Sequence, residues 1–102
     1  MSDPAPKIVD PDHLLVQAAR NGDFEAFERL VAQYEQSIYT LAMRIVRKSQ
    51  DAEEVVQETF LSVVEHLKDF QGASTFHTWL VRIATNHALK ILRKRRGLPV
   101  VP

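Results

Sequence analysis

The chain has 102 residues, enough for one hydrophobic core but not two, and its 45% hydrophobic and 25% charged content excludes a disordered chain. It has no cysteine, so disulfides and thiolate metal sites are excluded. It has no apolar run near the roughly 20 residues of a membrane span and no secretory pattern, so a cytoplasmic protein without membrane contact is expected. The net charge is zero, yet all 13 acidic residues lie within residues 1–75, whereas residues 76–102 carry six basic residues and no acid. This division predicts one cationic and one polyanionic partner. The alternative is that the charges only solvate the exposed faces of helices.

The first half of the chain predicts a leader and two helices. Residues 1–11 hold three prolines and are expected to be flexible, and a short helix follows from Asp12 to Asn21. Asp23 is expected to cap a long second helix that ends in the polar residues 47–50. Its apolar residues share an arc of about 120°, the width of a core-facing stripe: Phe24, Phe27, Leu30, Val31, Tyr34, Ile38, Leu41, Ala42 and Ile45.

Two more helices are predicted in the second half. Asp51 and Glu54 have the spacing of a capping box at the start of a third helix. Its buried side is expected to consist of Val55, Val56, Thr59, Phe60, Val63, Val64 and Leu67. After a loop, Ser74 or Thr75 caps a last helix that runs to Arg96. No segment alternates with period two, so we predict an all-α fold: a compact bundle of about four helices, one short and three long, over residues 12–96.

The last helix has two separate faces. One is apolar: Phe76, Leu80, Ile83, Ala84, His87, Ala88 and Ile91. The other carries Arg82, Asn86, Lys90 and Arg93, with Trp79 at its edge. Basic side chains along a rod match the spacing of phosphates, and asparagine can hydrogen-bond base edges, so this face predicts nucleic-acid binding. A merely solvated face remains the alternative.

Aromatic residues gather just before this basic face. Phe70, Phe76, His77 and Trp79 lie within ten residues. We expect at least two of them to belong to the core. The others could stack on unpaired bases, because every base has a π face.

An acidic stripe is predicted on the third helix, formed by Asp51, Glu54, Glu58 and Glu65 beside Leu61. It cannot favour DNA, so a cationic protein surface is its expected partner, and a solvated face is the alternative. The histidines at positions 13, 66, 77 and 87 form no H-x-x-x-H pair, and there is no phosphate loop or nucleophile elbow. We therefore expect a binding protein without cofactor, metal or catalytic residue, and His87 to be a core residue. A metal-dependent enzyme is the least favoured alternative.

Three blocks of sequence resemble region 2 of the extracytoplasmic-function (ECF) sigma factors, members of the sigma-70 family that direct bacterial RNA polymerase. They are residues 51–60 (DAEEVVQETF), residues 69–72 (DFQG) and residues 75–84 (TFHTWLVRIA) with Asn86, and the likeness covers residues 12–96. It implies a transcription initiation module. Its third helix would dock on the clamp helices of the polymerase beta-prime subunit through Asp51, Glu54, Gln57, Glu58 and Leu61.

The resemblance also implies that the loop and last helix recognise and melt the minus-ten promoter element. They would capture non-template bases, one of them flipped into a pocket of the loop, with no ATP site needed. The residues expected to bind DNA are Phe70, Gln71, Gly72, Ala73, Ser74, Thr75, Phe76, Trp79, Arg82, Asn86, Lys90 and Arg93. An anti-sigma factor is an expected partner, and a module held chiefly by such a regulator is the alternative function.

The sequence departs from the family in three positions and at its end. Gln71 stands where some relatives have arginine, and His77 and Val81 where others have tyrosine, so the preferred bases are not implied. Residues 97–102 resemble the start of an interdomain linker. The second helical domain, which binds the minus-thirty-five element, is expected to be absent, and the chain alone is expected to initiate poorly.

Overall fold

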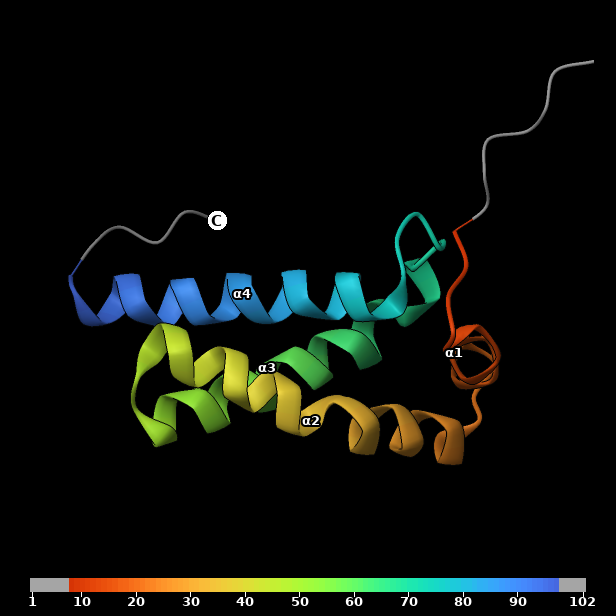
Figure 1. Ribbon diagram of the computed structural model, residues 1–102, viewed down its shortest axis with the longest axis horizontal. Helices are drawn as coiled ribbons and strands as arrows, with labels where there is room; N and C mark the ends of the chain where they lie inside the picture. The colour runs from red at the N-terminus through yellow and green to blue at the C-terminus, as the bar shows by residue number, and fades with distance from the viewer. Residues whose placement is uncertain (1–7, 98–102) are drawn as a thin grey trace, which may run out of the picture.

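The computed structural model describes residues 8–97, which form a helical bundle without strands. Figure 1 shows α4 lying along one side of the α2–α3 pair, and α1 crossing the end of the bundle beside the loop that precedes α4. The predicted all-α fold with one short and three long helices is confirmed. The elements are α1 (His13–Arg20), α2 (Phe24–Val46), α3 (Ser49–His66), the 3-10 helix η1 (Leu67–Asp69) and α4 (Phe76–Arg95). Each helix of the described part is too short or too polar to cross a lipid bilayer.

The core lies where α2, α3 and α4 meet. Its largest fully buried side chains come from all three helices: Leu30, Ile38, Val46, Val55, Thr59, Val63, Phe76 and Leu80. All of them except Val46 belong to the apolar stripes that the sequence predicted. Two residues of the apolar stripes predicted for the second and third helices lie outside the core. Phe24 is 67% exposed and Val64 is 60% exposed, because both lie in a terminal turn and line a surface hollow instead of the core.

The predicted caps are correct for two helices and wrong for the third. The side chains of Asp23 and Thr75 accept hydrogen bonds from the backbone of α2 and α4, each over 3.1 Å. α3 begins two residues before Asp51, and its N-cap residue, Lys48, makes no side-chain hydrogen bond to the helix. The Asp51 carboxylate instead pairs with Arg95 of α4 over 3.1 Å, so it joins two helices and does not cap one.

The segment before α1 is part of the bundle. Asp10 Oδ2 accepts a hydrogen bond from the backbone amide of Phe76 over 2.8 Å, which ties this segment to the start of α4. The carboxylate of Asp12 is buried and accepts hydrogen bonds from Gln33 Nε2, over 2.8 Å, and from the Tyr34 hydroxyl. Residues 8–11 were predicted to belong to a flexible leader, but these contacts place the start of the domain before residue 12. Residues 1–7 and 98–102 lie outside the described part.

The Tyr34 hydroxyl makes the free energy of unfolding depend on pH in the alkaline range. Burial, followed by the hydrogen bond to Asp12, raises the pKa of Tyr34 well above its usual value of 10.0. The folded chain therefore keeps the proton after the unfolded chain has released it, so this contribution to stability is complete below about pH 10 and is lost as the pH rises further. Tyr34→Phe should flatten the fall of the unfolding free energy between pH 9 and 11, measured by urea denaturation. Tyr39→Phe, on the same helix, should leave the fall of the unfolding free energy as steep as in the unmodified chain. If the unfolding free energies of both variants fell equally steeply with pH, the role of Tyr34 would be contradicted.

Candidate nucleic-acid and protein interfaces

The loop of residues 70–75, between η1 and α4, is fixed at both ends. Phe70 is only 8% exposed and Phe76 is fully buried, and their rings meet edge to face with centroids 6.3 Å apart. Gly72 has a φ of +74°, a backbone conformation that residues with side chains rarely adopt. This conformation allows the chain to turn. The exposed residues of the loop are therefore Gln71, Gly72 and Ala73, held between two buried anchors.

Among the aromatic residues near the loop, the structure separates core from surface. The expectation that at least two belong to the core is confirmed by Phe70 and Phe76. Phe76 has no exposed surface, so in this structure it cannot meet DNA as the resemblance implied; as the first residue of α4 it points into the bundle. Trp79 is half-buried and stacks on Phe70, with ring centroids 4.8 Å apart. It is the aromatic residue best placed to meet a base.

Two hollows open on either side of the loop. The first, which we call the α4-side hollow, has a volume of about 390 Å³ and is lined by Asp69, Phe70, Gln71, Ala73, Ser74, Trp79 and Arg82. It combines an aromatic ring with a guanidinium group. The second, the α1-side hollow, has a volume of about 440 Å³, and its lining includes His13, Gln17 and Arg20 of α1 as well as the loop. The contribution of α1 was missed from the sequence, because only folding brings α1 beside residues 70–74.

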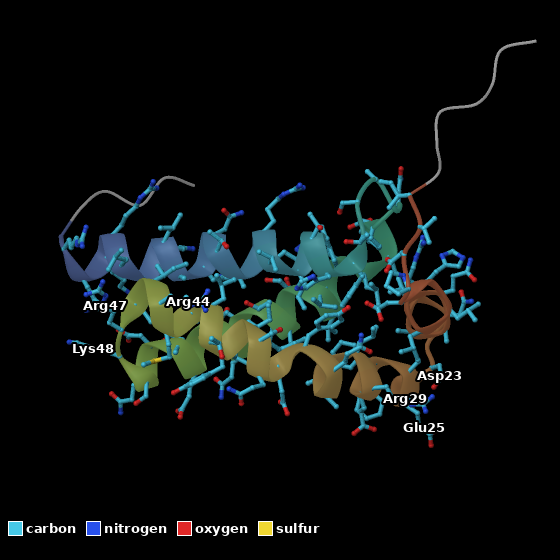
Figure 2. All side chains as sticks on the ribbon, in the orientation of Figure 1. Asp23, Glu25, Arg29, Arg44, Arg47 and Lys48 are labelled. Carbon is cyan, nitrogen blue, oxygen red and sulfur yellow. The ribbon has the colours of Figure 1, made fainter. Side chains whose placement is uncertain are left out.

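The outer face of α4 is the polar face that the sequence predicted. Arg82, Asn86, Lys90 and Arg93 are all exposed, and Figure 2 shows side chains projecting from α4 away from α2 and α3. The predicted core residue His87 is half-buried, and its Nε2 atom lies 3.0 Å from Ser62 Oγ of α3. His87 thus joins α3 to α4 through a polar contact and does not belong to the fully buried core.

The acidic stripe of α3 is exposed along most of its length. Glu54, Gln57 and Glu58 face solvent, and Leu61 beside them is 54% exposed. Asp51 is set apart from them, because it is half-buried against Arg95.

A groove between α2 and α3 borders this stripe. Its volume is about 430 Å³, and its lining is Glu35, Gln36, Tyr39, Glu53, Val56 and Gln57. Only Gln57 was predicted to bind a partner. Glu35 and Tyr39 lie four residues apart on one helical face, and this spacing could have indicated that α2 forms the second wall of the groove. Within residues 8–97, no three His, Asp or Glu side chains come together as metal ligands would.

Comparisons with known proteins agree with this arrangement. The family model for sigma-70 region 2 matches residues 30–97. RNA polymerase sigma-H factor of Pseudomonas aeruginosa is 40% identical over 90 residues, which is 88% of this chain and 47% of that protein. The ECF RNA polymerase sigma-E factor of Escherichia coli K12 is 42% identical over 81 residues, which is 79% of this chain and 42% of that protein. The chain thus spans a little under half the length of these curated relatives.

A solved structure is similar over nearly the whole chain. It is the NMR structure of an engineered region 2 of sigmaE in complex with GTAAAA, with a TM-score of 0.75 and 37% sequence identity, and the match covers 94% of this chain and 97% of that one. Sequence and fold therefore give the same assignment. The chain belongs to the sigma-70 family, as a region 2 domain of the ECF group.

Proposed function

We propose that this domain serves transcription initiation by joining RNA polymerase to the minus-ten promoter element. In this proposal α3 docks on the clamp helices of the beta-prime subunit, and the loop with α4 captures unpaired bases of the non-template strand. The observation that carries it is the continuity of the α4-side hollow with the exposed basic face of α4, through Arg82. The related sigmaE domain solved in complex with GTAAAA supports the same use of this fold.

Base capture explains how the promoter could open without ATP. Unstacking a base step costs a few kcal/mol, and binding of the freed base must offset that cost. Stacking on an aromatic ring contributes roughly 1–3 kcal/mol per base, and charged contacts to the adjacent phosphates add to it. Trp79 supplies the ring, Arg82 and Lys90 the charges, and the exposed amides of Gln71 and Asn86 the groups that can distinguish bases.

The domain should therefore prefer single-stranded DNA. We expect fluorescence anisotropy to show tighter binding of the DNA oligonucleotide GTAAAA than of the same sequence as a duplex. Asn86→Ala or Gln71→Ala should reduce discrimination at one base position by about 1–3 kcal/mol, and should reduce nonspecific affinity less. Gln36→Ala, an exposed amide on α2, is the matched control and should change neither. Equal affinity for duplex and single strand would rule out base capture.

The acidic stripe should be required for polymerase binding and dispensable for folding. Glu54→Lys with Glu58→Lys should weaken capture of polymerase core about tenfold, because two charge contacts become repulsive. Both side chains are exposed, so the melting temperature should hardly change. Glu25→Lys with Glu28→Lys reverses two exposed charges on α2 and should bind polymerase normally. Unchanged capture of the folded α3 variant would show that another face makes the contact.

A regulatory protein is the second candidate partner, and exposed apolar surface favours it. Phe24, Phe27 and Val64 line a hollow of about 240 Å³ at the end of the bundle nearest α1. An anti-sigma factor that occupied this hollow could also cover the acidic stripe. Co-purification of the domain with a small helical protein, in competition with polymerase, would identify this function.

A further inference from the structure

α3 and α4 carry equal and opposite charge. α3 contains five acidic residues and no lysine or arginine, whereas α4 contains five basic residues and no acid. The two helices pack against each other (Figure 1), and within residues 8–97 the ion pair that joins them is Asp51 with Arg95. Glu65 approaches only His66, on α3 itself, over 3.7 Å. Most of the charge on each helix is therefore unpaired in this part of the chain.

Exposed side chains of the two helices form seams with the same spacing. The α3 seam consists of Glu54, Glu58, Leu61 and Glu65. The α4 seam consists of Arg82, Asn86, Leu89 and Arg93. Each seam advances by steps of four, three and four residues, which keeps it within an arc of about 60° on its helix. These steps are typical of a helix face that contacts another helix.

The two seams are complementary when the helices run parallel. Aligned by position, both ends pair a glutamate with an arginine, and the leucines meet in between. Asn86 then faces Glu58 and can donate a hydrogen bond from its amide to the carboxylate. Reversing one helix would set each leucine against a polar residue. The parallel alignment therefore satisfies every position of both seams.

The overall charge of the chain does not oppose association of its copies. The chain has 13 basic and 13 acidic residues, so its net charge is zero. A protein without net charge is not kept apart from its copies by repulsion. Leu61 is 54% exposed and Leu89 is 38% exposed, and contact between them would remove apolar surface from water.

We propose that the α3 seam binds the α4 seam of a second copy of this chain. This interaction goes beyond the proposed function, and it covers the faces that this function assigns to polymerase and to DNA. A copy held in this way is available to neither until it dissociates. Each seam spans 12 residues, or about 16 Å. The contact is therefore small and weak, and salt screens its charges.

Sedimentation equilibrium of the 102-residue chain tests this interaction. At about 0.5 mM protein and about 20 mM salt, we expect an average mass at least about 1.3 times the monomer mass of 11.7 kDa, and the monomer mass at about 500 mM salt. Glu54→Gln with Glu58→Gln removes the charge of one seam, and Arg82→Gln with Arg93→Gln that of the other. Each double variant alone should stay monomeric. An equimolar mixture of the two should associate again and stop at the dimer, because it restores one contact between intact seams.

Matched variants separate the seams from net charge. Glu25→Gln with Glu28→Gln, and Arg29→Gln with Lys48→Gln, remove the same charge from exposed positions outside the seams. Both should associate as the unmodified chain does, and circular dichroism would confirm that every variant is folded. The inference is overturned by an unmodified chain that stays monomeric at low salt, by a seam variant that still associates, by a mixture that stays monomeric, or by controls that lose association equally. These outcomes do not depend on binding of polymerase or GTAAAA, so they leave the proposed function to its own tests.

Discussion

Asp12→Ala should lower the free energy of unfolding by about 3 kcal/mol, although residue 12 lies before the first helix. The carboxylate is only 4% exposed and accepts hydrogen bonds from Gln33 and Tyr34 of α2. Hydrogen bonds to a buried charge are worth about 1.5–3 kcal/mol each, and removal of the acceptor leaves the half-buried Tyr34 hydroxyl without its partner, while the exposed Gln33 amide can bond to water. For a domain of this size, a loss of 3 kcal/mol corresponds to a fall in melting temperature of about 12–24 °C, which calorimetry would measure.

Two variants define the cause of this loss. Asp12→Asn keeps an acceptor oxygen without the charge and should be destabilised less than Asp12→Ala. Asp69→Ala removes an exposed carboxylate and should change stability by no more than about 0.5 kcal/mol. A loss below about 1 kcal/mol for Asp12→Ala would mean that the segment before α1 contributes little to the bundle.

Trp79→Ala should weaken binding of single-stranded GTAAAA about five- to 150-fold. This range corresponds to the roughly 1–3 kcal/mol that one base stacked on an aromatic ring contributes. Trp79 is half-buried, lines the α4-side hollow and stacks on Phe70, so its indole ring is both supported and accessible. Anisotropy titrations at one fixed salt concentration would measure the effect, with circular dichroism to confirm the helical fold.

Two further substitutions distinguish stacking from general disturbance of the loop. Trp79→Phe retains a π face and should recover most of the affinity. His77→Ala removes an exposed ring that stacks on Tyr34, with centroids 5.1 Å apart, and should leave DNA binding nearly unchanged. If the alanine variant at position 79 binds as tightly as the unmodified domain, base stacking belongs to another residue.

Local sequence patterns predicted the helices well and the contacts between distant segments poorly. The apolar stripe of α2 and the cap at Thr75 depend on residues within a few turns of each other, so the sequence carries the full signal. The hydrogen bond from Phe76 to Asp10 joins residues 66 positions apart, and no periodicity reports it. The capping box at Asp51 failed for the same reason, because a distant arginine binds that carboxylate.

The candidate sites follow the same division. Residues of one helix face, such as Arg82 and Asn86, could be predicted because a single helix determines which side chains lie together. The groove between α2 and α3 and the α1-side hollow each need two or three elements to form their walls. Their residues appear ordinary in the sequence. The burial of Phe76 agrees with its place on the apolar face predicted for the last helix, whereas its expected contact with DNA came from the resemblance.

The fixed ends of the loop determine how the cost of binding is shared. A mobile loop would have to give up conformational entropy when a base entered, and that loss would reduce affinity. In this domain the buried rings of Phe70 and Phe76, together with the hydrogen bond from the Phe76 amide to Asp10, restrict the loop before DNA arrives. The ordering cost then falls mainly on the flexible single strand. Stiffening the DNA strand before binding should therefore raise the affinity for this surface more than substitutions that rigidify the protein.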